Sequence, residues 1–115
     1  MKRGDVYWAT LTPRSGAEQA GRRPVIVVSR DAFNQAPGWR SVIVVPVSTS
    51  PSQARRGPTA VMLPAGAGGL AHESVALCHQ VTTLDRAKLD APLGSLTTAH
   101  VRDVEDGLRI ALGME

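Results

Sequence analysis

Cysteine is nearly absent from this 115-residue sequence, which has a single one at position 78. One thiol cannot form an internal disulfide, and no cysteines and histidines cluster with the spacing of a zinc site. The sequence therefore predicts no metal or other cofactor, and the lack of disulfides favours a reducing, cytoplasmic compartment.

Long apolar segments are missing as well. The longest apolar runs, near residues 24–28 and 42–47, have the length of strands and not of a membrane span. The basic start of the chain is interrupted by Asp5 and is followed by no apolar stretch of the kind found in a leader peptide. We therefore expect neither secretion nor membrane insertion.

Aromatic residues are few, because Tyr7, Trp8, Phe33 and Trp39 are all that the chain contains. The core must therefore consist mainly of aliphatic side chains, and we expect most of these four rings to lie in it too. Thirteen valines outnumber ten leucines, and 11 glycines and 8 prolines punctuate the chain. This composition favours short strands joined by turns over helices.

The hydrophobic pattern predicts one domain over residues 1–115, built from several strands and one closing helix. The expected strands are residues 6–11, 23–29, 41–47, 59–63, 74–83 and 90–96, with a helical turn at 31–34. Pro46 predicts a sheet edge or a bulge near the end of its strand. A helix capped by Thr97 or Thr98 should end at Gly113. The predicted fold is mainly β (α+β): a small, strongly bent antiparallel sheet or partly open barrel with a C-terminal helix.

Charge is unevenly distributed along the chain, although the net charge is only +3. Residues 1–60 have nine basic and three acidic groups, whereas residues 61–115 have four basic and seven acidic groups. Eight of the nine basic residues in the first half are arginines, whose planar guanidinium suits phosphate oxygens. An anionic polymer or phosphoester is an expected partner, although an ordinary solvated surface has the same composition.

Two segments without periodicity interrupt the strands, at residues 12–22 and 51–57, and loops of this length often serve a site. Metal-free RNA cleavage needs a base for the 2′-hydroxyl proton, donors for the phosphorane and an acid for the 5′-oxygen. Side chains of suitable chemistry lie at these junctions: Glu18, Arg22, Arg23, Ser48 and Thr49. Such residues flank strands in many small β proteins, so the chemistry alone does not select this function.

The three histidines are rival general bases, since imidazole titrates near neutral pH. We expect His72 in a turn, His79 within a strand and His100 in the exposed first turn of the helix. No two share a short motif, and for each a satisfied or solvent-facing role fits the pattern better than catalysis. Cys78 lies in an apolar stretch and is expected to pack and not to react.

Several segments, taken in chain order, are more specific. The runs Arg3-Gly4-Asp5-Val6-Tyr7-Trp8, Glu18-Gln19-Ala20-Gly21-Arg22-Arg23-Pro24, Pro46-Val47-Ser48-Thr49 and Gln80-Val81-Thr82-Thr83-Leu84 resemble the signature of the MazF/PemK family of toxin endoribonucleases. The resemblance covers nearly the whole chain. It implies a compact SH3-like barrel that works as a homodimer. It also implies metal-independent cleavage of single-stranded RNA to a 2′,3′-cyclic phosphate and a 5′-hydroxyl.

The resemblance implies roles for individual residues too. Arg23 corresponds to the family's catalytic arginine, and Ser48 occupies a position where members usually have threonine. Glu18 and Gln19 lie in the loop that closes over the RNA in the family, and Gln80 matches a glutamine near the same groove. These residues are the expected catalytic and substrate-binding groups.

Further assignments rest on side-chain chemistry. Serine at position 48 lacks the methyl group that would restrict its rotamer, so Thr49 is an alternative donor to the phosphate. Arg22, Arg55 and Arg56 are expected to hold the RNA backbone without reading bases. Because arginine stays protonated, we assign charge stabilisation to Arg23 and leave the base open.

Three functional hypotheses are open at this point. The first is a sequence-specific endoribonuclease toxin, which a cognate antitoxin would block with a disordered acidic tail. The second is a noncatalytic, CcdB-like toxin that poisons a DNA topoisomerase, because a related toxin branch has the same barrel. The third is a nucleic-acid-binding barrel without activity. Arg23, Ser48 and the basic first loop favour the first hypothesis.

Overall fold

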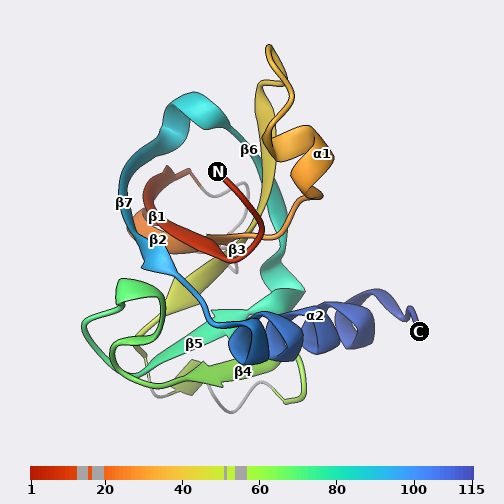
Figure 1. The fold of residues 1–115 in the computed structure, drawn as a ribbon. Helices are drawn as coiled ribbons and strands as arrows, with labels where there is room; N and C mark the ends of the chain where they lie inside the picture. Colours follow the sequence, from red (N-terminus) through yellow and green to blue (C-terminus); the bar gives the residue numbers. More distant parts are fainter. Residues whose placement is uncertain (13–15, 17–19, 51, 54–56) are drawn as a thin grey trace.

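The computed structural model of the 115 residues describes the chain except for residues 13–15, 17–19, 51 and 54–56. The described residues form a strongly bent antiparallel sheet of seven strands, with a long helix against one end (Figure 1). The strands are β1 (Asp5–Leu11), β2 (Gly21–Val27), β3 (Ser41–Ser48), β4 (Ala60–Leu63), β5 (Ser74–Leu77), β6 (Thr82–Asp85) and β7 (Leu89–Ser95). The helices are α1 (Asp31–Asn34) and α2 (Thr98–Leu112), with 3-10 turns η2 (Ala67–Gly69), η3 (Cys78–Gln80) and η4 (Arg86–Lys88).

Strand β3 pairs along both of its edges. The order of the sheet is β4-β5-β3-β2-β1-β7, and β6 also pairs with β3. One edge of β3 pairs with β2 through residues 44–46. Its other edge pairs with β6 through residues 41–44 and then with β5 through residues 47–48. The sheet therefore bends where β3 changes partner.

Pro46 lies at this change of partner, so its strand is not at the sheet edge, and the other predicted alternative, a bulge, corresponds to the irregular pairing beside it. Its residue pair on β2 is Val25, and on the other side it falls between the segments paired with β6 and with β5. A residue without an N–H group is tolerated there because no ladder partner faces it on that side.

The single strand predicted over residues 74–83 was wrong, because β5, η3 and β6 divide this segment. Val47 pairs with Ala76 and Val44 with Thr82, so two residues of β3 face five residues of its partner. The 3-10 turn η3 accommodates the extra residues, in the way that a β-bulge accommodates a single extra residue. His79 accordingly lies in η3 and not in a strand.

The core consists of aliphatic side chains in two clusters on the two sides of the sheet. Val25 and Val27 of β2 belong to one cluster, whereas Ile26 and Val28 belong to the other, as the alternation of a strand requires. None of the four aromatic rings is buried, which corrects the expectation above. Phe33 and Trp39 are exposed and pack on each other, with ring centroids 4.8 Å apart.

Helix α2 has the predicted boundaries. The Thr97 hydroxyl accepts the His100 N–H at 3.2 Å, and Gly113 ends the helix with a φ of 67°. Gly107 allows close packing on η3 and β4, because a Cβ there would lie 2.8 Å from Cys78 Sγ and from Val61 Cγ2. No helix among the described residues is both long and apolar enough to cross a membrane.

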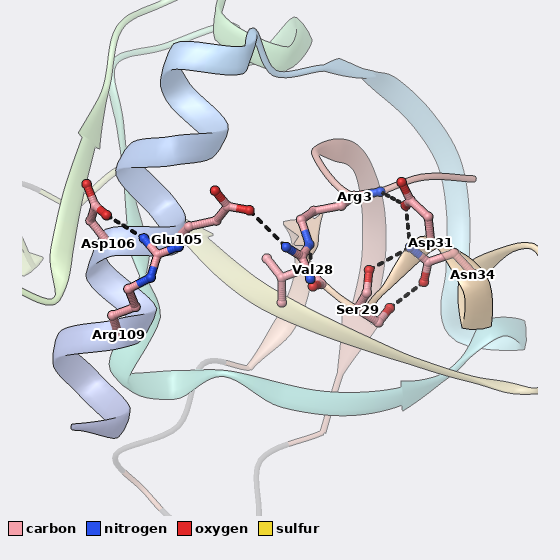
Figure 2. Close-up of polar contacts among 8 residues, drawn as sticks. All are labelled: Arg3, Val28, Ser29, Asp31, Asn34, Glu105, Asp106 and Arg109. Atoms are coloured by element: carbon pink, nitrogen blue, oxygen red, sulfur yellow. Dashed lines mark hydrogen bonds and ion pairs between the residues drawn. The ribbon is translucent and has the colours of Figure 1, made fainter. Parts of the chain in front are cut away.

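Arg3 joins α2 to the start of the chain (Figure 2). Its Nη1 donates to Glu105 Oε2 at 2.8 Å and its Nε donates to the Val28 carbonyl at 3.0 Å. Its backbone N–H donates to Asp31 Oδ1 at 2.6 Å, and this bond is the main reason that the pKa of Asp31 is lowered. Asn34 completes the network by bonding Asp31 and Ser29.

Candidate functional site

A groove of about 300 Å³ opens where the start of β2, the end of β3 and the segment before β5 meet. Polar residues from three parts of the chain line it: Arg22 and Arg23, then Thr49, then His72 and Ser74. Apolar residues, among them Trp8, Pro24, Val47 and Leu93, complete the lining. The described lining residues include two arginines and no carboxylate, so the groove suits an anionic ligand.

Arg23 lies across from Ala9 of β1 and is half-buried. Its Nε donates to the Ala20 carbonyl at 3.1 Å, which ties the guanidinium to the end of the first loop. Its two Nη groups make no hydrogen bond with any residue that the structure describes. Among the described residues, these donors have no partner that a phosphate would have to displace.

Arg22 has a different environment. Its guanidinium carbon lies 4.5 Å from the centroid of the Trp8 ring, and its Nε is 3.1 Å from Asp90 Oδ2. Both charged side chains are about half exposed, so this ion pair contributes at most about 1 kcal/mol to stability. The ring holds the Arg22 cation at the edge of the groove, where it can exchange Asp90 for another anion.

The two hydroxyls at the end of β3 are in different surroundings. Thr49 is exposed and lines the groove. Ser48 is 4% exposed and does not line it, and its hydroxyl accepts the Ser50 N–H at 3.1 Å. The structure thus presents Thr49, the alternative donor, to a ligand and places Ser48 beneath the surface.

The wall formed by residues 69–74 is closely fitted to β7. Gly69 has a φ of 79°, and a Cβ there would lie 2.1 Å from the Leu93 carbonyl oxygen, so only glycine fits. The buried Ser74 hydroxyl donates to the His72 carbonyl at 2.7 Å, which fixes the backbone at His72. His72 lies in a bend, as predicted, and its exposed side chain borders the groove.

Comparison with known proteins identifies the fold and the family. The chain matches the family described as "PemK-like, MazF-like toxin of type II toxin-antitoxin system" over residues 2–112. The chain belongs to this family. It is 34% identical to endoribonuclease EndoA of Bacillus subtilis and 33% identical to endoribonuclease MazF of Staphylococcus saprophyticus. Each alignment covers 99% of this chain, with 96% and 92% of the respective relative.

A solved structure of similar fold is a mycobacterial endoribonuclease in complex with its cognate antitoxin. It superposes with a TM-score of 0.80 and 27% identity, and covers 100% of this chain and 97% of the other. The expected mainly β fold of a MazF-like toxin, a bent antiparallel sheet with a C-terminal helix, is thereby confirmed.

The MazF-like groove contains only some of the residues that the sequence nominated. Arg22, Arg23 and Thr49 line it, whereas Glu18, Gln19, Arg55 and Arg56 lie outside the described residues. Gln80 is half-buried in η3, at the opposite end of β5 from Ser74, and does not line the groove. Gln80 and Arg23 therefore do not share this groove among the described residues.

The sequence did not place two of the groove residues, Trp8 and Ser74, beside the arginines. A signal for Trp8 existed, because it pairs with Pro24 and its strand neighbour Thr10 pairs with Arg22. Alternation along the β1–β2 hairpin therefore puts Trp8 and Arg22 on one face. Ser74 has no such signal, since only the pairing of β5 with β3 brings it near Thr49.

Cys78 lies apart from the groove. It is fully buried, its thiol donates to the Val104 carbonyl at 3.6 Å, and burial raises its pKa to about 11. Because the thiolate is the reactive form, this cysteine is a packing residue, in agreement with the prediction.

Proposed function

We propose that this chain, a MazF-like endoribonuclease toxin of a toxin–antitoxin system, cuts single-stranded RNA in the groove between β2 and the segment before β5. The observation that carries the proposal is that Arg23 and Thr49 both line one groove whose described residues include no carboxylate. Both groups donate hydrogen bonds, and the cleaved phosphate is the anion that needs them.

The reaction consistent with this site is attack of the ribose 2′-oxygen on the neighbouring phosphorus. The attack produces a phosphorane whose negative charge is greatest in the transition state, so donors already in place stabilise it most. Arg23 supplies a forked pair of N–H donors and Thr49 supplies a hydroxyl. The products are a 2′,3′-cyclic phosphate and a 5′-hydroxyl, and the chemistry consumes no water.

The test uses purified protein with a long single-stranded RNA in the presence of EDTA. Cleavage of this RNA and not of its duplex, with ends that carry a cyclic phosphate and a 5′-hydroxyl, supports the proposal. Intact RNA after prolonged incubation, together with inhibition of a DNA topoisomerase by the same preparation, would support the rival noncatalytic toxin instead. Binding of RNA without either effect would support an inactive barrel.

A homodimer is part of this proposal, in line with the resemblance to MazF/PemK toxins. Three large apolar side chains at the end of α2 are exposed: Ile110 (54%), Leu112 (58%) and Met114 (63%). Next to them is a hollow of about 250 Å³ lined by Val28, Leu108 and Met114 and by three charged residues, Arg3, Glu105 and Arg109. The exposed apolar side chains suit a twofold contact between copies. Light scattering at micromolar concentration should give twice the mass of the chain.

A cognate antitoxin is the second proposed partner, because the mycobacterial endoribonuclease of similar fold was solved with one. A disordered acidic segment that placed carboxylates beside Arg22 and Arg23 would compete directly with RNA phosphates. Such binding should weaken with salt and should protect RNA from cleavage. We propose that residues 1–115 act as one domain and that their RNA target lies in the cytoplasm.

A further inference from the structure

Among the described residues that line the groove, His72 is the one whose side chain has a basic nitrogen that is not part of a guanidinium. The described ionisable residues of the groove are Arg22, Arg23 and His72. Arginine is protonated at physiological pH, and the hydroxyls of Thr49 and Ser74 are poor bases. The imidazole is therefore the described group suited to general base catalysis in this groove.

The position of His72 agrees with the geometry that the reaction needs. In the sheet, β3 lies between β2, which carries Arg23, and β5, which follows His72. Two strand spacings separate the outer strands, or roughly 10 Å, so a phosphate group fits between these walls. In-line attack by a 2′-oxygen places the base and the leaving 5′-oxygen on different sides of the phosphorus, so a base on the wall before β5 leaves the side toward β2 to the leaving oxygen.

Two contacts fix the backbone on either side of His72. The Ser74 hydroxyl bonds the His72 carbonyl, and Gly69 packs on the Leu93 carbonyl of β7. Around the imidazole, the charged groups of the described elements are Arg22 and Arg23 on β2, with Asp90 on β7 paired to Arg22, and the adjacent Glu73.

We infer that His72 is the general base of this endoribonuclease, an inference that rests on the proposed function. Neutral His72 takes the proton of the 2′-hydroxyl while the 2′-oxygen forms its bond to phosphorus. The bond from phosphorus to the 5′-oxygen then breaks, and that oxygen takes a proton from water. His72 returns its proton to the solvent, so protons balance over one turnover.

The experiment measures single-turnover cleavage of one RNA oligonucleotide between pH 5 and pH 9 by the wild-type protein and by His72→Gln. The wild-type rate should rise with pH and then level off as the base loses its proton. His72→Gln should lose about 10²–10⁴-fold in rate and should lack that rise. Its affinity for the uncleavable 2′-deoxy analogue should stay within about threefold of the wild type. Added imidazole should restore part of the activity of His72→Ala.

His100→Gln is the matched control, because His100 lies on α2 and does not line the groove. It removes a histidine and should keep both the rate and the pH profile, with folding checked by thermal melting. His79 is less suitable because it neighbours Gln80, which the sequence nominates for substrate binding.

Three outcomes would overturn the inference. The first is a His72→Gln rate within about threefold of the wild type at every pH. The second is a loss of affinity as large as the loss of rate, which would make His72 a binding residue. The third is disappearance of the rise with pH in Glu18→Gln and its persistence in His72→Gln. Wild-type protein that cut no RNA would instead contradict the proposed function itself.

Discussion

Ser48 and Thr49 are neighbours in the chain, yet only Thr49 lines the groove, whereas Ser48 is buried and accepts the Ser50 N–H. The family pattern favours position 48 for the catalytic hydroxyl, and the geometry of this chain favours position 49. The change of surroundings occurs where β3 ends at Ser48. We therefore expect the two positions to make separable contributions to folding and to catalysis.

We expect Thr49→Ala to lower the single-turnover rate by about 10²–10³-fold, as removal of one preorganised donor does, without a change in melting temperature. Ser48→Ala should instead lower the free energy of unfolding by about 0.5–1.5 kcal/mol, because the Ser50 N–H loses its acceptor. Cleavage assays and chemical denaturation of both variants test this assignment. An inactive but stable Ser48→Ala beside an active Thr49→Ala would restore the family assignment.

The forked geometry of Arg23 gives a second prediction. Lysine retains the charge but presents it as a point, so Arg23→Lys should lose nearly as much rate as Arg23→Ala. The Ala20 carbonyl that accepts from Arg23 Nε should favour the forked side chain further, since it fixes the orientation of the guanidinium. Single-turnover rates of both variants, beside their affinities for the 2′-deoxy analogue, check the prediction. Near-wild-type cleavage by Arg23→Lys would show that charge alone suffices.

The strands and α2 were predictable because their signals are local. Glycine and proline mark the turns, a continuous apolar run marks β2, and Thr97 and Gly113 mark the ends of α2. The division of residues 74–83 was not predictable, because it depends on β3 having two partners along one edge. Pairing of this kind is a long-range property that no window of sequence contains.

The candidate site likewise contains residues that the sequence could indicate and residues that only the fold brings together. Arg23 and the hydroxyls at positions 48 and 49 stand in short motifs, so the sequence could nominate them. His72 could be considered only as one of three isolated histidines, because its nearness to Arg23 arises from the order β5-β3-β2. The aromatic rings do not form the core, which consists mainly of valine: Phe33 and Trp39 are exposed, and Tyr7 packs at the margin of one core cluster.

Arg22 should contribute to RNA affinity through charge. If it replaces its contact with Asp90 by one with a phosphate, Arg22→Ala should reduce the slope of log K against log salt by about 0.7. Titration of the 2′-deoxy analogue at several salt concentrations measures the slope. Arg102→Ala, an exposed arginine on α2, is the control and should leave the slope unchanged. Equal slopes for Arg22→Ala and the wild type would remove Arg22 from the interface.

Cys78 provides a prediction about stability at high pH. Burial raises the pKa of its thiol from 9.0 to about 11 in the folded chain, so the unfolded chain releases this proton at lower pH. Ionisation of this thiol should therefore not lower the free energy of unfolding below about pH 9. Between about pH 9 and pH 11 the free energy of unfolding should fall progressively. Cys78→Ala removes the thiol, so its stability should fall less steeply over that interval, although it starts lower because of the small cavity. Denaturation curves of both proteins at several pH values give the two slopes. Parallel slopes would mean that the thiol ionises equally readily in the folded and unfolded chains.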